Sequence, residues 1–512
     1  MDLIPQNGPS STSGRQKLAT LIIVLALAII AIGMRLYGLN ETFDYDGYDE
    51  GVYWQTLRAM SAGYGLYKQV FCSQPPAFML LVYPFYALLG STISAARVGV
   101  ATLSLLGLAG AYLMGKALAG RAGGIVAMLI LIVTPIYLAE SQILQAEGPA
   151  TALLFLTAGA ALMWWEHPTG RKGMALAITC GITLSLGTLI KLLDATAFAP
   201  ILLLVFARLW QVRRETSSST LVFLLPIAAA VVAFVVATLV VLAPFLGSLH
   251  AALQQVVTFH IAAKKAMVSS EVENIHILGS FFATNAVLSA TAIVGIVVTI
   301  LRCDWRAIPL IAWVLVTFIA LIIQAPLFPR HAIVLIPPLI AIIALGLNDL
   351  PLGKEMRQII RQHIPPAQKG ALLMGLLALA TVLVSIPSDY TYYRTLGARA
   401  ESSATQLVAR IATEMELVTS PDQWVITDAQ FVAGLANRDT PPWLVDTSAV
   451  RVLSGYLTTQ ELLQAGSDAR VHAVLFATNR LAVPPVASFR YWVAGRFYPL
   501  RTYGTGIELW IR

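Results

Sequence analysis

Carboxylates gather directly after the first long apolar segment of the chain. Four acids lie within seven residues, and tyrosines follow them: Asp44, Asp46, Asp49 and Glu50, then Tyr53 and Tyr67. A carboxylate flanked by aromatic rings suits a general base that acts on a stacked sugar. The same acids also suit the first turn of a helix, where the dipole favours negative charge. We predict Asp49 and Glu50 as catalytic carboxylates, and Tyr53 and Tyr67 as substrate contacts.

A second pair of acids flanks a short segment between two apolar stretches. Glu140 ends one stretch, and Glu147 precedes Gly148-Pro149 at the start of the next. Glu147 is therefore expected in the first turn of a helix, where a catalytic role and a favourable interaction with the helix dipole both explain it. We predict Glu147 as a third catalytic carboxylate.

Basic residues interrupt apolar sequence at two places. Lys191 stands inside GTLIKLLDATAF, and a charge within a bilayer costs about 2.5–3.5 kcal/mol. Asp194 lies on the same helical face and is one explanation, because it would neutralise the lysine. The other explanation is a lipid-linked phosphate at the membrane interface. Arg330-His331 follows Pro329 before another apolar run, where Arg330 suits a phosphate or anchors the segment at the membrane surface.

The long polar segment around residue 260 adds further cations. His260, Lys264, Lys265 and His276 all fall in it. We therefore predict a group of phosphate-binding residues: Lys191, Arg330, His331, Lys264 and Lys265.

Membrane helices are the elements that must position these residues. Of the 512 residues, 57% are hydrophobic and only 12% are charged, whereas soluble domains carry about 25% charged residues. Apolar runs of about 20 residues indicate transmembrane helices. We expect eleven spans, at about 17–38, 94–115, 122–139, 148–165, 173–190, 192–208, 220–246, 279–301, 306–324, 331–348 and 370–387. The stretch 76–90 is short and contains Pro84, so an interfacial or re-entrant helix is expected there.

Basic residues also predict which side of the membrane each loop occupies. With a cytoplasmic N-terminus, the clustered arginines, Arg302 and Arg306 among them, fall on the cytoplasmic side of the plasma membrane. The acids, Lys191, Arg330 and everything from Ser388 onward then face outward. The net charge of +7 comes from these loop clusters, so no nucleic acid is expected as a partner.

Three regions are expected along the chain. Residues 1–16 predict a disordered cytoplasmic N-terminus, and residues 17–387 a membrane domain with an outer loop at 39–93. Residues 388–512 lose the long apolar runs and predict a small soluble α/β domain. Its expected elements are a helix at 407–418, strands at 424–427 and 473–477, a helix opened by a Thr458–Glu461 capping box, and an edge strand at 506–511.

Several functions are excluded by what the sequence lacks. There is no GxxxxGK[ST] loop, so a pump driven by its own ATPase is excluded. The three cysteines are scattered and predict neither a zinc site nor a disulfide framework.

In their order and spacing, these segments resemble the GT-C membrane glycosyltransferases, and within them the branch of protein O-mannosyltransferases and the lipid A aminoarabinose transferase. The resemblance covers about residues 17–387. It comprises Asp49-Glu50, Gly63 to Tyr67, Gln74-Pro75-Pro76, SAARVGVATLSLLGLAGAYLMGKALAGRAGGIVA, Glu147-Gly148-Pro149, GTLIK and FPRHAIVLIPP.

The expected fold is therefore an all-α polytopic membrane protein, GT-C-like, with about eleven transmembrane helices, followed by the small C-terminal α/β domain read from the sequence. The resemblance implies a polyprenyl-phosphate-linked sugar as donor and a protein, lipid or glycan acceptor outside the cytoplasm. Asp49 would activate the acceptor with Glu50 assisting, and Lys191 and Arg330 would hold the donor phosphate. Glu147 stands where relatives usually carry Asp. No cofactor is expected to be required, and a divalent metal is left open.

Two other classes of function stay open from the sequence. In a transporter or flippase for a lipid-linked or anionic solute, the acids would relay protons and Lys191 would bind the solute. A non-catalytic scaffold of a cell-envelope complex is the other.

Overall fold

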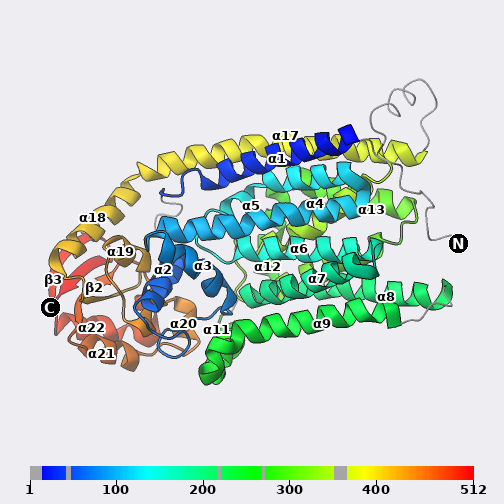
Figure 1. The fold of residues 1–512 in the computed structure, drawn as a ribbon. Coiled ribbons are helices and arrows are strands. Elements are labelled where there is room, and N and C mark those ends of the chain that lie inside the picture. Colours follow the sequence, from blue (N-terminus) through cyan, green and yellow to red (C-terminus); the bar gives the residue numbers. More distant parts are fainter. Residues whose placement is uncertain (1–13, 42–47, 216–220, 268–270, 351–365) are drawn as a thin grey trace.

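Long helices form a bundle, and a small domain with a β-sheet stands at one end of it (Figure 1). The computed structural model describes residues 14–41, 48–215, 221–267, 271–350 and 366–512. Within these ranges, eight helices are long and apolar enough to cross a membrane, or nine if a pair bent by 91° counts as one span. The predicted all-α polytopic membrane fold with a small α/β domain is confirmed.

The long helices coincide with the apolar segments of the sequence. They are α1 (Gly14–Leu36), α4 (Ile93–Ile132), α6 (Glu147–Glu166), α7 (Gly170–Ile190), α8 (Phe198–Glu215), α9 (Leu221–Leu242), the bent pair α12 (Glu271–Thr284) and α13 (Ala286–Leu301), α14 (Ala307–Ile323), α15 (Ile336–Gly346) and α17 (Pro366–Ala400). Many outward leucines and valines of α9 are exposed, Leu239 by 59% for example, as expected of a surface that faces lipid. The start of α1 at Gly14 shortens the predicted disordered N-terminus, whose residues 1–13 lie outside the described ranges.

Helix α4 accounts for two of the expected spans because it folds back on itself. Its backbone leaves the helical conformation at Ala119 and Gly120, and Gly120 has φ +65°, which favours glycine. A Cβ on Gly115 would lie 2.3 Å from the carbonyl oxygen of Gly123. Residues eight apart in a continuous helix are about 12 Å apart, so the two halves must pack side by side.

Shorter helices connect the long ones. They are α2 (Tyr48–Ser61), α3 (Ala77–Leu88), α5 (Pro135–Glu140), η1 (Leu192–Ala197), η2 (Ala243–Ser248), α10 (Leu249–Leu253), η3 (Gln254–Thr258), α11 (Phe259–Ala266) and η4 (Pro329–Leu335). Helix α3 is the short helix expected at 76–90. With 12 residues it is about 18 Å long, which is too short to cross a bilayer.

The C-terminal domain holds a mixed sheet of four strands in the order β1-β2-β4-β3. Its elements are α18 (Ser403–Val418), β1 (Trp424–Thr427), α19 (Gln430–Leu435), η5 (Pro442–Leu444), α20 (Ala449–Leu453), α21 (Thr459–Ser467), β2 (Val471–Phe476), η6 (Arg480–Ala482), η7 (Pro484–Val486), α22 (Ser488–Ala494), β3 (Tyr498–Gly504) and β4 (Ile507–Ile511). Strands β1 and β2 are parallel, and β4 runs antiparallel to both β2 and β3. The Thr458–Glu461 capping box opens α21 as predicted.

Two expectations for this domain are corrected. The segment predicted as an edge strand, β4, lies inside the sheet, and the edge strand next to it is the unpredicted β3. Strand β3 contains Pro499, which is tolerated on an edge strand. Nearly all of β3 is exposed, so its sequence has no alternating apolar pattern that would predict a strand. The boundary predicted at Ser388 falls inside α17, which continues to Ala400 because Leu396 packs against Leu39 after the first span.

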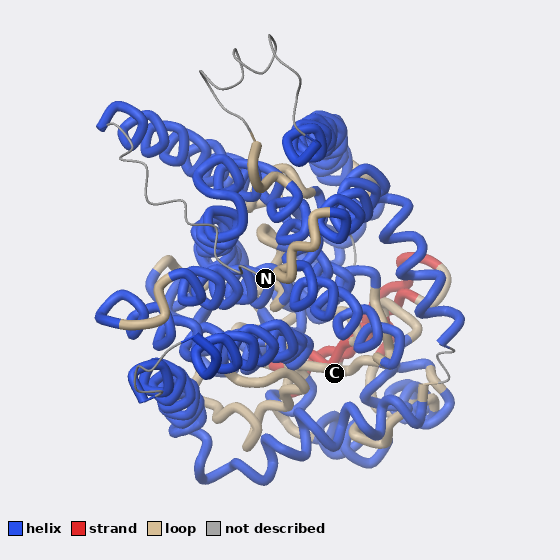
Figure 2. The backbone as a smooth tube through the Cα atoms, turned by 90° about the vertical axis from the view of Figure 1, so that its right-hand side faces the viewer, coloured by secondary structure: helices blue, strands red, loops and turns tan. Residues whose placement is uncertain are grey.

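The C-terminal domain docks on α2. A Cβ on Gly51 would lie 2.2 Å from the backbone nitrogen of Phe431, so α2 and α19 touch backbone to backbone. Beside this contact, Gln55 donates to the carbonyl oxygen of Arg438 at 3.0 Å, and Arg58 pairs with Asp439 at 2.6 Å. Figure 2 looks along the bundle from its other end, with the strands behind the helices.

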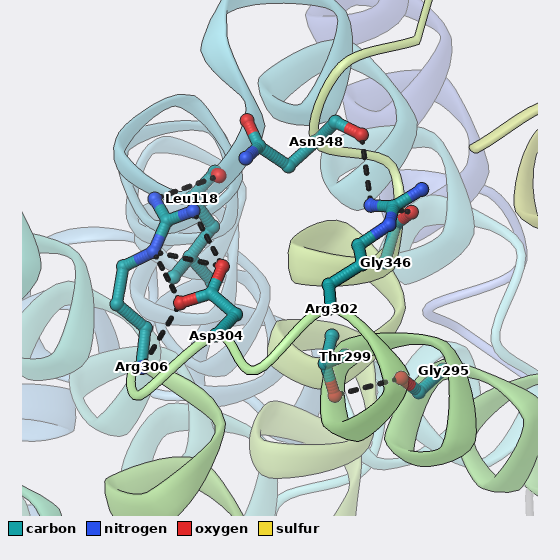
Figure 3. A network of polar contacts seen from close by, with 8 residues as sticks. All are labelled: Leu118, Gly295, Thr299, Arg302, Asp304, Arg306, Gly346 and Asn348. Carbon is teal, nitrogen blue, oxygen red and sulfur yellow. Dashed lines mark hydrogen bonds and ion pairs between the residues drawn. The ribbon is translucent and has the colours of Figure 1, made fainter. Parts of the chain in front are cut away.

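Arginines close the opposite end of the bundle (Figure 3). Arg302 donates to the carbonyl oxygen of Gly346, the last residue of α15, at 3.3 Å and to that of Asn348 at 3.0 Å. Arg306 pairs with Asp304 at 2.7 Å and donates to the carbonyl oxygen of Leu118 at 3.4 Å. The last carbonyl groups of a helix lack partners within it and favour cations. The loop after α13, predicted as cytoplasmic, therefore lies at the end of the bundle away from the C-terminal domain.

Candidate active site

The charged residues singled out in the sequence sit at helix ends and breaks at the domain-bearing end of the bundle. Asp49 lies in the first turn of α2, and Tyr53 lies one turn later on the same face. Glu147 is the first residue of α6. Lys191 occupies the extended residue between α7 and η1, and Arg330 is the second residue of η4.

Arg330 joins two of the predicted carboxylates. Its Nη2 lies 2.6 Å from Oδ2 of Asp49, and its Nε lies 3.2 Å from Oε1 of Glu147. The guanidinium also stacks over the ring of Phe328, with its central carbon 4.7 Å from the ring centroid. Three segments that lie far apart in the sequence thus meet at one side chain.

Lys191 completes the cluster from the other side of Glu147. Its ammonium forms an ion pair with Oε1 of Glu147, and Nε2 of His331 lies 3.7 Å from the same oxygen. The neutralising pair with Asp194, one of the two explanations for this lysine, is not among the ion pairs of the described residues. Asp194 instead lies against Gly187, where a Cβ would be 2.8 Å from its Oδ2.

Glu50 points away from this cluster into the protein. Arg97 of α4 binds both of its oxygens, at 2.9 and 2.6 Å, and the backbone N–H of Leu144 donates to Oε1 at 2.7 Å. The side chains of Glu50 and Arg97 are each only 1% exposed. Its oxygens are thus bound within the protein, although the residue borders the cavity described next.

A cavity of about 1370 Å³ opens beside the cluster, larger than the roughly 300–1,000 Å³ of a typical small-molecule site. It is lined by all of the clustered residues: Asp49, Tyr53, Glu147, Lys191, Arg330 and His331. The C-terminal domain contributes Asp446 and Arg480 to its wall. The space is thus large enough for two substrates, and both domains contribute to its wall.

Three residues predicted to contact substrate lie elsewhere. Tyr67 is 1% exposed and donates to the carbonyl oxygen of Gln74 at 2.7 Å, because it packs into the core beneath the loop. Lys264 donates to the carbonyl oxygen of Ile323 at 2.9 Å, and Lys265 is exposed. Neither lysine lines the cavity, since α11 turns Phe259, His260 and Ala263 toward it. Asp44 and Asp46 lie outside the described residues.

The surroundings of Asp49 change its acid–base chemistry. Asp49 keeps 36% of its side-chain surface accessible and lines the cavity. Loss of water around it raises its pKa, and the charge of Arg330 lowers that pKa by a smaller amount. The outcome is a carboxylate that accepts a proton more readily than an ordinary aspartate.

Some residues of the site gave only weak signals in the sequence. Glu140, at the end of α5, lines the cavity, and so do His276 of α12 and Arg399 of α17. Asp446 accepts a hydrogen bond from the hydroxyl of Tyr48 at 3.0 Å, and Arg480 stacks on the ring of Tyr48 at 3.8 Å. Such partners from a separate domain are invisible to local spacing. Among the described residues, no group of three His, Cys, Asp or Glu side chains is arranged to hold a metal ion.

The segment that holds most of the clustered residues is similar to a known protein family. Residues 21–255 match the family described as dolichyl-phosphate-mannose-protein mannosyltransferase. This region holds Asp49, Glu50, Glu147 and Lys191 and ends before Arg330. No curated protein sequence matches the chain.

Solved structures match over nearly the whole chain. ArnT from Cupriavidus metallidurans in the apo state superposes with a TM-score of 0.64, covering 97% of each chain at 14% identity. The same protein bound to undecaprenyl phosphate gives 0.62, over 98% of each chain at 14% identity. The chain has the GT-C fold. The GT-C oligosaccharyltransferase of Archaeoglobus fulgidus, tethered to an acceptor peptide, matches with a TM-score of 0.53 at 14% identity, over 98% of this chain and 74% of that one.

The matched family and the matched structures indicate the same class of fold. The resemblance stated from the sequence is confirmed at the level of the fold, and residues 21–255 are similar to a family of membrane mannosyltransferases.

Proposed function

We propose that the protein transfers a sugar, a hexose or a pentose, from a polyprenyl phosphate carrier to an acceptor hydroxyl. The observation that carries this proposal is the convergence of Asp49, Glu147, Lys191 and Arg330 beside one large cavity. A base and two cations at one place are what the reaction requires. The matched family and the ligand of the solved relative, undecaprenyl phosphate, support the kind of donor.

In the proposed reaction, Asp49 removes the proton of the acceptor hydroxyl as its oxygen attacks the anomeric carbon. The bond between that carbon and the phosphate oxygen breaks, and its electron pair leaves with the phosphate. Lys191 and Arg330 stabilise the charge that grows on the phosphate. Tyr53, one turn from Asp49, offers a ring on which the sugar stacks.

Glu147 and Glu50 take positioning roles in this scheme. Glu147 is 4% exposed and binds both cations, so it holds them in place before the donor phosphate arrives. Glu50, bound by Arg97, fixes the first turn of α2 and with it the direction of the neighbouring Asp49. Neither carboxylate needs to touch the reacting atoms.

The proposal includes the side of the membrane. The loop after α13, which holds Arg302 and Arg306, lies at the end of the bundle away from the C-terminal domain, and this supports the proposed orientation. Positive loops stay in the cytoplasm, so the site and the C-terminal domain would face outward at the plasma membrane. A protein, lipid or glycan of the cell envelope is the acceptor class that this side offers.

A transporter or flippase is the rival function. Transporters place paired charges near the middle of the bilayer on repeated halves, whereas the charged residues of this site lie at helix ends beside the soluble domain. This arrangement favours chemistry at the surface over passage across the membrane.

The test is transfer by the purified protein in vesicles. Polyprenyl phosphate carrying a radiolabelled hexose or pentose is supplied together with envelope extract from the source organism. We expect label to move from the lipid to the extract with the wild-type protein and not with Asp49→Asn. Label that stays on the lipid but crosses the bilayer would instead establish the transporter.

A further inference from the structure

Glu140 is a buried carboxyl group that the reaction above does not use. It ends α5, is 8% exposed and lines the cavity. Its Oε2 has no hydrogen-bond partner among the described residues. Buried carboxyl oxygens almost always have a partner, so this oxygen is placed to meet something that enters the cavity or to carry a proton.

The backbone brings Glu140 against the cation cluster. Glu147 and Gly148 open α6, and a Cβ on Gly148 would lie 2.3 Å from the carbonyl oxygen of Glu140. The glycine therefore lets the first turn of α6 abut the end of α5. This contact explains why a glycine follows Glu147. It also places the carboxyl groups of Glu140 and Glu147 at the same end of the cavity.

The charges around Glu140 come from every neighbouring element. They are Asp49 of α2, Glu147 of α6, Lys191 after α7 and Arg330 of η4, with the phenol of Tyr392 from α17. Three carboxyl groups face two cations, so the ionised cluster would carry one excess negative charge. A bound phosphate would add another in an enclosed space, where like charges repel strongly.

One carboxyl group must therefore hold a proton when the donor is bound. Glu147 is bound by Lys191 and Arg330, and Asp49 is bound by Arg330. Glu140 has no ion pair among the described residues and is the member that stays protonated at least cost. In agreement, burial and, to a smaller degree, the charge of Glu147 raise the pKa of Glu140 to about 8.

We propose that Glu140 is the proton donor to the departing phosphate, a role that rests on the glycosyl transfer proposed above. As the carbon–oxygen bond to the phosphate breaks, the freed electron pair on the phosphate oxygen takes the proton of Glu140. The products are the glycosylated acceptor, a polyprenyl hydrogen phosphate, ionised Glu140 and protonated Asp49. Asp49 then releases its proton to water and Glu140 regains one, so atoms and charges balance.

The test uses Glu140→Gln, which keeps the size and polarity of the side chain and cannot give up a proton. Transfer is followed against pH with saturating and with limiting donor. For the wild-type protein we expect kcat to fall above about pH 8, as Glu140 loses its proton. For Glu140→Gln we expect kcat about 10²-fold lower, an unchanged KM for the donor and no fall at high pH. Glu140→Asp should regain part of the rate and the fall at high pH.

Glu416→Gln serves as the matched control, because Glu416 lies exposed on α18 and should leave both the rate and the pH profile as in the wild type. A Glu140→Gln variant with wild-type kcat and profile would overturn the role. If the variant fails to fold, a wild-type profile that stays flat to pH 9 overturns it as well. A wild-type protein that transfers no sugar refutes the proposed function itself, and the role with it.

Discussion

Arg97 binds both carboxylate oxygens of Glu50, one residue away from the proposed base Asp49. The same guanidinium donates to the carbonyl oxygens of Leu39 and Glu41. One arginine on α4 therefore connects the end of the first span to the helix that carries the base.

Removing one member of this pair should destabilise the protein. Glu50→Gln leaves the buried charge of Arg97 without its partner, and breaking a buried ion pair costs about 3–5 kcal/mol. We expect a clearly lower unfolding temperature in detergent, measured by tryptophan fluorescence. The exposed pair of Asp468 and Arg470 gives the comparison, since Asp468→Asn should cost about 0–1 kcal/mol. Equal stability of the two variants would contradict the positioning role.

Replacing the base should affect the rate and spare binding. In Asp49→Asn the side chain cannot accept the acceptor proton, so we expect transfer to fall about 10²- to 10⁴-fold with donor binding retained. Asp422→Asn, at an exposed position of the C-terminal domain, should behave as wild type. Undiminished transfer by Asp49→Asn would remove this residue from the mechanism.

The raised pKa of Asp49 predicts the acidic side of the pH profile. The base works only when ionised, and its enclosure raises its pKa above the ordinary aspartate value of about 3.9. Activity should therefore be full above the raised pKa and fall tenfold for each pH unit below it. The measurement is kcat/KM between pH 4 and 7. A profile that stays flat down to pH 4 would speak against Asp49 as the base.

Loss of the lysine should weaken donor binding. Lys191→Met removes one cation from the phosphate site, and a hydrogen bond to a charged group contributes about 1.5–3 kcal/mol, or about 10- to 100-fold in affinity. Native mass spectrometry with a titrated polyprenyl phosphate measures this loss. Lys68→Met, on an exposed lysine of the outer loop, is the control. Equal affinity in both variants would place the phosphate elsewhere.

The contact between α2 and α19 tolerates no side chain. A Cβ on Gly51 would clash with the backbone of Phe431, so Gly51→Ala should cost about 1–3 kcal/mol and make the C-terminal domain easier to cleave by protease. Gly247→Ala adds the same methyl group where nothing lies within 4 Å and should have no such effect. Protease resistance that matches wild type in Gly51→Ala would show that the two helices separate freely.

The sequence predicted the site residues that stand next to long apolar runs. Asp49, Glu147, Lys191 and Arg330 were found because a charge at the end of such a run is costly and noticeable, and the structure brings them together. Partner choice was harder. Helical spacing offered Asp194 as one of two explanations for Lys191, whereas its partner in the structure, Glu147, starts a different helix, which local periodicity cannot indicate.

Charged residues that do not adjoin a long apolar run were harder to assign to the site. Lys264 and Lys265 lie side by side in the sequence, yet they project away from the cavity because α11 presents its other face. Arg97 was missed as a partner of Glu50 because it is one basic residue within an apolar segment. The wall formed by Asp446 and Arg480 depends on how two domains dock, which no short stretch of sequence encodes.

The docking of α19 onto α2 has a consequence for engineering. Because the soluble module rests on the very helix that bears the base, it cannot be exchanged between relatives as an independent cap. A chimera that imports this module should also import α2 with its Gly51. Otherwise the mismatched contact would tilt Asp49 and change the shape of the opening through which acceptors enter.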